Sequence, residues 1–229
     1  MMDVRIGSYR MSDFGLGLLK MELGAAQVQS STLEIPGRNG TLDLTEAVTG
    51  YPVYKNAKHK LTFDFRDGSY DTWIAKSSEL KGKIHGKRLP VVLGMDTFYY
   101  DARISVDTSK LNADYSQIVI SLDAQPYKLA IRSSLDDWLW DPFNFETDVI
   151  REYKNIAVPG SITIIGGVMP AGCIYDCSAE GITVEYEGIS CRLPKGKSAV
   201  PDILIREGEH TMTFTGSGTI SVEYREGRF

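Results

Sequence analysis

Hydrophobic and polar residues alternate along several stretches of this chain, and the alternation predicts mostly β-strands. The clearest case is His59–Arg66, where Leu61, Phe63 and Phe65 fall on one face. Other stretches of the first 130 residues show similar alternation or a short apolar run between turn-forming residues: Val4–Gly7, Leu16–Leu23, Ala26–Ile35, Leu89–Leu93, Thr97–Val106 and Tyr115–Leu122. Gly24 separates the second and third of these, which indicates a hairpin.

One helix is predicted among these strands. The side chains of one helical face recur every three or four residues, at Tyr70, Trp73, Ser77, Leu80 and Ile84, and all but the serine are largely apolar. Ser69 precedes them and can serve as the N-cap. The pattern predicts a helix over about 69–81, and we expect Trp73 to anchor it against the sheet.

The stretch Leu33–Tyr54, reading LEIPGRNGTLDLTEAVTGYPVY, has few core-type side chains and no helical period. Pro36-Gly37 and Asn39-Gly40 favour tight turns, because glycine supplies a positive φ and asparagine tolerates one. A compact domain seldom contains so long a segment unless the segment is functional, disordered or ordered from outside. We expect an arm that another subunit holds in place.

Short strands separated by glycine and proline continue in the last seventy residues. Their near-regular spacing predicts a small β-sandwich or barrel. The candidates are Ser161–Ile165, Gly172–Cys177, Ile182–Tyr186, Ile189–Leu193, Asp202–Ile205, His210–Phe214 and Thr219–Tyr224.

Residues 131–155 differ from both flanks, because acidic residues alternate there with large aromatic ones. A flexible linker would not carry so many aromatic side chains. We therefore expect a structured connection in which Trp138 and Trp140 are buried in interdomain packing. The alternative is a sugar-stacking platform. The expected organisation is thus an N-terminal domain over 1–130, the connection, and a C-terminal domain over 156–229.

Composition and charge narrow the function classes. The hydrophobic share of 42% is that of an ordinary globular protein, and the formal net charge is −5. The acidity lies after residue 130, and neither part is basic enough to suggest sequence-specific nucleic-acid binding. The chain has neither a secretory signal pattern nor an apolar run of about 20 residues, so we expect cytoplasmic synthesis without membrane insertion.

A short basic segment follows the predicted helix. Its charged or titratable side chains are Lys81, Lys83, His85, Lys87 and Arg88. One interpretation is a solvated turn, and the other is a contact with an acidic surface, such as a neighbouring subunit. Phosphate binding has less support, because no aromatic residues interleave to stack bases.

Candidate chemistry is sparse. Cys173, Cys177 and Cys191 are an odd set, which suggests reduced thiols rather than a disulfide framework. The first two lie four residues apart on one predicted strand, so both face the same side, and we expect them in the core. The sequence contains no Walker motif, dinucleotide fingerprint, metalloprotease helix or nucleophile elbow. We expect no enzyme, no cofactor and no metal.

The order of segments resembles the distal tail proteins of siphophages and prophages, which are baseplate hub components. The resemblance is carried by IPGRNGTLDLTE (Ile35–Glu46), KLTFDF (Lys60–Phe65), LPVVLGMDTFYYDARI (Leu89–Ile104), YSQIVISLDAQPYK (Tyr115–Lys128) and GTISVEYREGRF (Gly218–Phe229). It is most specific in the first and third of these and at the end of the fourth.

This resemblance implies a mainly β fold of β-rich α+β type. An N-terminal β-sandwich-like domain would carry one helix and an extended belt, and the C-terminal domain would be a galectin-like or carbohydrate-binding-module-like sandwich. Carried onto this chain, the belt is about 33–54. Its contact candidates are Ile35, Pro36, Gly37, Arg38, Asn39, Gly40, Asp43 and Tyr51.

The implied role is a structural hub at the tip of a long non-contractile tail in the virion. Six copies would form a ring that joins the tail tube protein to a tail-associated hub or lysin protein. Tape-measure and receptor-binding proteins are further implied partners. The alternative is a carbohydrate-binding or host-adhesion module, and ring assembly or glycan binding by a monomer would separate the two.

Overall fold

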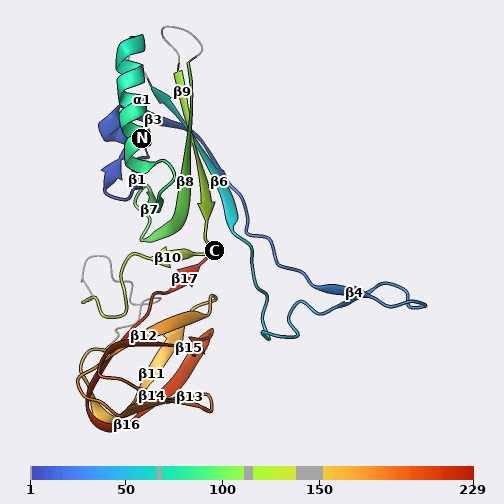
Figure 1. Ribbon diagram of the computed structural model, residues 1–229, viewed down its shortest axis with the longest axis vertical. Helices are drawn as coiled ribbons and strands as arrows, with labels where there is room; N and C mark the ends of the chain where they lie inside the picture. Colours follow the sequence, from blue (N-terminus) through green and yellow to red (C-terminus); the bar gives the residue numbers. More distant parts are fainter. Residues whose placement is uncertain (1, 66–68, 111–115, 138–151) are drawn as a thin grey trace. The chain divides into compact units, whose positions relative to one another are not determined.

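The computed structural model describes residues 2–65, 69–110, 116–137 and 152–229, and it divides into two compact units (Figure 1). The first unit comprises Met1–Lys128 and Phe229, and the second comprises Leu129–Arg228. The expected C-terminal domain included Phe229, but this last residue packs with the first unit. The described elements are mostly strands, so the chain has the expected β-rich fold.

Among the described residues, the first unit carries one α-helix, nine strands and the start of a tenth. In chain order its elements are β1 (Val4–Ile6), β2 (Tyr9–Arg10), the 3-10 helix η1 (Met11–Phe14), β3 (Leu16–Leu23), β4 (Thr32–Glu34), β5 (Thr41–Asp43), β6 (Ala57–Phe65), α1 (Tyr70–Ile84), β7 (Arg88–Leu93), β8 (Phe98–Lys110), β9 (Ser116–Ala124) and the start of β10 (Lys128–Ala130). The main sheet has the order β2-β1-β7-β8-β9-β6-β3, so β3 lies at an edge.

Alternation along the strands places the core on one face of this sheet. In β9 every second side chain from Ser116 to Ala124 is buried, and the intervening side chains are only partly buried. Residues from both ends of the strand order, such as Val4 in β1 and Phe63 in β6, belong to the same hydrophobic core. The opposite face is polar.

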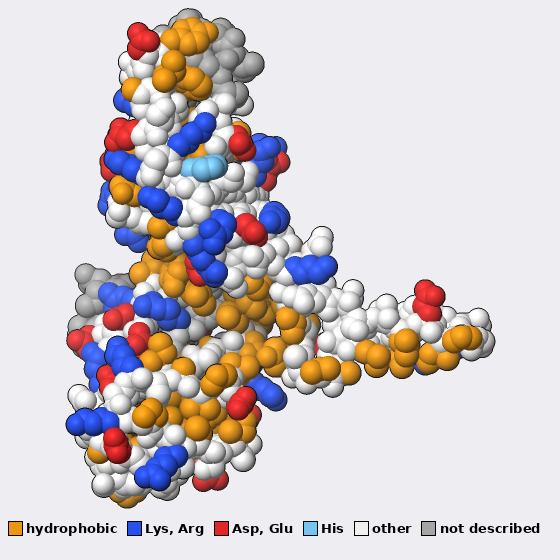
Figure 2. Space-filling view, in the orientation of Figure 1, with side chains coloured by type: hydrophobic (Ala, Val, Ile, Leu, Met, Phe, Trp, Pro, Cys, Tyr) orange, Lys and Arg blue, Asp and Glu red, His pale blue; other side chains and the backbone are white. Residues whose placement is uncertain are grey.

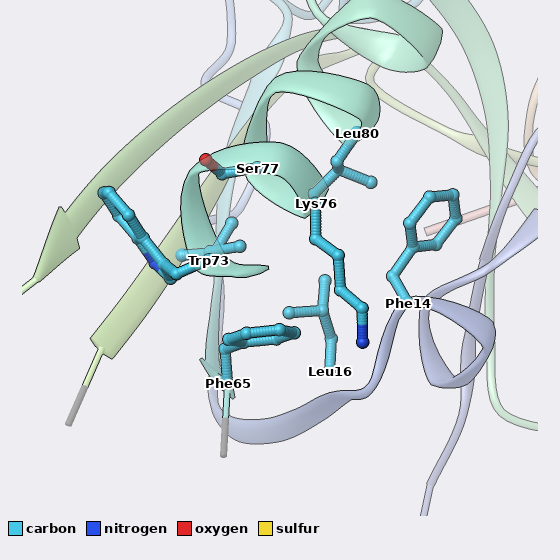
Figure 3. Close-up of a pocket in the computed structure, with 8 residues that line it drawn as sticks. Phe14, Leu16, Phe65, Trp73, Lys76, Ser77 and Leu80 are labelled. Carbon is cyan, nitrogen blue, oxygen red and sulfur yellow. The ribbon is translucent and has the colours of Figure 1, made fainter. Parts of the chain in front are cut away.

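Helix α1 covers part of the core. The Ser69 hydroxyl accepts the Thr72 amide hydrogen, which caps the helix as expected. The helix runs on to Ile84, three residues beyond the expected end, because Ile84 is itself fully buried. Figure 3 shows Trp73, Lys76 and Leu80 of the helix around the same junction as Phe14, Leu16 and Phe65, and no space for a water molecule remains in this junction.

The hairpin expected around Gly24 is wrong. β3 pairs instead with β6, with Leu16 opposite Phe65 and Leu23 opposite His59. Gly24 makes its close contact with β6 as well, since its amide donates to the Lys58 carbonyl oxygen at 3.2 Å. A Cβ at this position would lie 2.4 Å from that oxygen, so only glycine fits there.

The second unit is a six-stranded sheet with its own core. Its elements are β11 (Ile156–Gly166), β12 (Ala171–Cys177), β13 (Ile182–Tyr186), β14 (Ile189–Leu193), β15 (Gly196–Ile205) and β16 (Gly208–Glu223), followed by β17 (Gly227–Arg228), which pairs with β10. β16 pairs with β11 on one side and with β13 and then β12 on the other. The change of partner falls at Gly216 and Gly218, which both have a positive φ.

Cys173 and Cys177 are buried in the core of the second unit, as their spacing predicts. Burial raises the pKa of the Cys173 thiol to about 12, so this thiol stays protonated at neutral pH. Both cysteines are free thiols.

Candidate functional site

The most unusual feature of the first unit is an arm, residues 24–56, that leaves the sheet after β3 and returns into β6 (Figure 1). No residue of the arm is buried. The arm is longer than the predicted belt of 33–54, because its two root segments also lie outside the core.

A short ladder forms the root of the arm. Val28 and Tyr54 form a β-bridge, the Gln29 amide donates to the Val53 carbonyl at 2.7 Å, and the Lys55 amide donates to the Gln27 carbonyl at 2.7 Å. Tyr54 also packs against Tyr127 and the C-terminal Phe229, with ring centroids 5.7 and 5.0 Å away. These contacts, rather than a hydrophobic core, hold the root to the sheet.

The distal part of the arm is a two-stranded hairpin of β4 and β5. Leu33 lies directly opposite Leu42, while Thr32 opposes Asp43 and Glu34 opposes Thr41. Directly opposed residues share a face, so one face of the hairpin is apolar and the other polar.

The apolar face extends beyond the paired residues. Ile35 and Leu44 continue the alternation of Leu33 and Leu42, and Figure 2 shows hydrophobic side chains in a row along the arm. Leu33 is 49% exposed, and Val48 in the following turn is 96% exposed. A two-stranded ribbon with an uncovered apolar face has little stability by itself, and such a face marks an interaction site.

The predicted belt residues gather at the hairpin tip and along its polar face. The turn from Ile35 to Gly40 places Pro36, Arg38 and Asn39 at the exposed tip. Gly37 and Gly40 both have a positive φ, as the turn chemistry predicts. The remaining two, Asp43 and Tyr51, lie further along the arm.

Asp43 is held by the arm itself. Its carboxylate accepts the Thr45 amide hydrogen at 2.9 Å. Hydrogen bonds from the Thr45 side chain and backbone lower the pKa of Asp43, so the carboxylate is ionised at neutral pH. Tyr51 is half-buried. Sequence reasoning missed Leu33, Leu42 and Leu44 as an apolar face, although their alternation was visible.

The edge strand β3 continues this exposed apolar surface. Leu19, Met21 and Leu23 are each more than a third exposed. Leu19 lies where the pairing with β6 shifts register between Leu18 and Lys20. An exposed edge strand with apolar side chains is normally covered by another segment.

The basic segment after α1 is engaged within the chain. Lys81 donates to the Thr108 hydroxyl at 2.9 Å, Lys83 pairs with Glu79 at 2.6 Å, and Lys87 donates to the Lys83 carbonyl at 2.7 Å. Arg88 makes two hydrogen bonds to Asp101, at 2.9 and 2.7 Å. These contacts close the end of the helix and join β7 to β8, and the contact of this segment with an acidic surface stays a prediction.

Trp73 is half-buried and packs against the core of the first unit, which is the anchoring position expected for it. Trp138 and Trp140 lie outside the described residues. Within the described ranges, no group of three or more His, Cys, Asp or Glu side chains could hold a metal ion. A search of the described helices finds none with the length and hydrophobicity needed to cross a membrane.

Comparison with solved structures finds a likeness over the whole chain. The crystal structure of SPP1 Dit (gp 19.1), which is described as a paradigm of the hub adsorption apparatus in phages infecting Gram-positive bacteria, superposes with a TM-score of 0.66. The match covers 100% of both chains at 8% sequence identity, so the likeness is one of fold. No protein-family model matches the sequence, and no curated protein does.

Proposed function

We propose, from the full-length fold likeness to a phage hub protein, that this chain is a non-enzymatic structural hub at the tip of a long non-contractile phage or prophage tail. Six copies form a ring that joins the tail tube protein to the tail-tip proteins, among them a tail-associated hub or lysin protein. The observation that carries this proposal is the match over 100% of both chains, because both units and their order are shared.

The arm supports assembly from several copies. Its apolar face has no cover among the residues that the structure describes, and ordering a segment without buried residues costs conformational entropy. A neighbouring copy would supply that cover. An arm that reaches from each copy to the next makes a heterologous contact, and such contacts close into a ring when the rotation permits.

The test measures assembly of the full chain by light scattering and negative-stain imaging. The wild type should form rings of six at high concentration. Leu33→Asp with Leu44→Asp places two charges on the apolar face of the hairpin and should leave monomers, because each buried leucine contributes about 1.5–3 kcal/mol. Thr32→Lys with Thr41→Lys adds two charges to the polar face of the same hairpin, each directly opposite a carboxylate, and serves as the matched control that still assembles.

Two results would contradict the proposal. If the wild type stays monomeric at every concentration and binds glycans, the result would indicate the adhesion module instead. Rings that persist in the double Leu→Asp variant would show that the arm does not make the subunit contact. Circular dichroism of both variants should match the wild type, since neither leucine is in the core.

A further inference from the structure

The polar face of the first unit's sheet contains a hollow of about 580 Å³. Three consecutive residues from each of β6, β9 and β8 line it (58–60, 121–123 and 103–105), and His85 and Gly86 form its rim. We call this feature the sheet hollow. It is separate from the arm, since none of its lining residues belongs to residues 24–56. Figure 2 shows Lys and Arg side chains, with Asp and Glu side chains among them, on the first unit.

A row of hydrogen-bond donors crosses the sheet hollow. Ser105 on β8 lies opposite Ser121 on β9, and Ser121 lies opposite Lys60 on β6. The register therefore brings two hydroxyls and an ammonium group onto the same face of three adjacent strands. None of the three side chains makes a hydrogen bond or ion pair with a residue that the structure describes.

The neighbouring row adds positive charge. Arg103 lies opposite Asp123, and Asp123 lies opposite Lys58. The Asp123 carboxylate is occupied by Lys58 at 3.1 Å and by the Asn56 amide at 3.1 Å. Arg103 uses one nitrogen, Nη1, to donate to the Gly86 carbonyl at 2.9 Å, and its other donors make no hydrogen bond with a residue that the structure describes.

Two further groups bear on the site. His85 Nδ1 accepts the Val106 amide hydrogen at 3.0 Å, so a neutral ring carries its hydrogen on Nε2 and can donate. Glu22, which lies opposite Lys60, is paired with Lys20 at 2.8 Å. Among the lining residues, three permanent cations face one carboxylate.

We propose that the sheet hollow binds a dianionic tetrahedral oxyanion, a phosphate or sulfate group. An excess of two positive charges matches a dianion better than it matches a single carboxylate. The donors come from three strands of a rigid sheet, so their positions are set before the anion binds. The group arrives either as a free ion or as part of a larger phosphorylated or sulfated molecule.

The test is an amide NMR titration of the full chain with inorganic phosphate at pH 8 and constant ionic strength. Saturable shifts should be confined to residues 58–60, 85–86, 103–105 and 121–123. A parallel titration with glycerol 1-phosphate separates the two sources: tighter binding indicates a group carried on a larger molecule, and equal or weaker binding indicates the free ion. A hexaglutamate peptide should bind more weakly than either.

Two variants that change the net charge of the sheet hollow in opposite directions make the test specific. Lys60→Gln should weaken phosphate binding about fivefold, and Asp123→Asn should strengthen it by a similar factor, because each changes one charge at the site. Lys195→Gln, at an exposed lysine of the second unit, removes the same charge and should change nothing. The proposal is overturned if chloride produces the same shifts, if hexaglutamate binds more tightly, or if neither site variant alters the affinity.

Discussion

His59 occupies a core position on β6 that would ordinarily hold an aliphatic side chain. It is 5% exposed, it stacks edge-on against Tyr100 with ring centroids 4.6 Å apart, and neither ring nitrogen has a hydrogen-bond partner among the described residues. Burial lowers the pKa of His59, because a charged ring would lose its hydration without gaining a counter-ion.

This burial predicts a pH dependence of stability. The unfolded chain takes up the His59 proton near pH 6.5, whereas the folded chain does so only at lower pH. The stability contributed by the neutral ring is therefore full above about pH 6.5 and is lost as the pH falls towards the folded pKa, by at most about 1.4 kcal/mol per pH unit.

Calorimetric unfolding of the full chain between pH 7.5 and 5.5 measures this effect. His59→Leu places an apolar side chain of similar size at the site and should flatten the pH dependence, whatever its effect at pH 7.5. His210→Gln changes a histidine of the second unit and should leave the pH dependence of the first unit's transition in place. If the stability of His59→Leu depends on pH as strongly as that of the wild type, the pH dependence arises from other groups.

At the scale of elements, the root of the arm depends on a residue from the far end of the chain. Phe229 contacts Tyr54 and Tyr127, with ring centroids 5.0 and 4.6 Å away. Aromatic pairs of this kind contribute about 0.5–1.5 kcal/mol each beyond the area they bury. The last residue of the sequence thus holds the point where the arm returns to the sheet.

Removing the Phe229 ring should therefore open the root without unfolding the unit. Tryptic cleavage after Lys55, whose amide is bonded within the root ladder, should be about tenfold faster in Phe229→Ala. Cleavage after Arg38, at the exposed tip, is an internal control that should not change. Phe229→Tyr keeps the ring and should behave as the wild type, and equal rates after Lys55 in Phe229→Ala would refute this role.

At the scale of the whole molecule, each unit has a hydrophobic core of its own. The second core includes Tyr175, Phe214 and Val222, all fully buried, and every member lies between residues 129 and 228. A core of this size normally supports independent folding.

A fragment of residues 129–228 should accordingly unfold cooperatively, with a midpoint within about 5 °C of the matching transition in the full chain. Calorimetry and near-ultraviolet circular dichroism measure this. Phe214→Ala in the fragment should lower the stability by about 3–5 kcal/mol, which confirms that the transition reports this core. A fragment without near-ultraviolet signal would show that the second unit needs the first.

The local sequence pattern by itself determined several elements of this protein. The alternation in β6 and β9, the helical spacing from Tyr70 to Ile84 and the scarcity of core residues in the arm are all visible in the sequence, because each depends on neighbours a few residues apart. The same period of two predicts that Cys173 and Cys177 lie in the core, which the structure confirms.

Only the tertiary structure decided which residues far apart in the sequence come into contact. β3 pairs with β6 across a 33-residue arm rather than with the segment after Gly24, and Gly24 is required by a carbonyl from residue 58. Phe229 joins the first unit, and Lys60, Ser105 and Ser121 meet on one face. Strand register and chain-end packing arise from non-local contacts, and no local period encodes them.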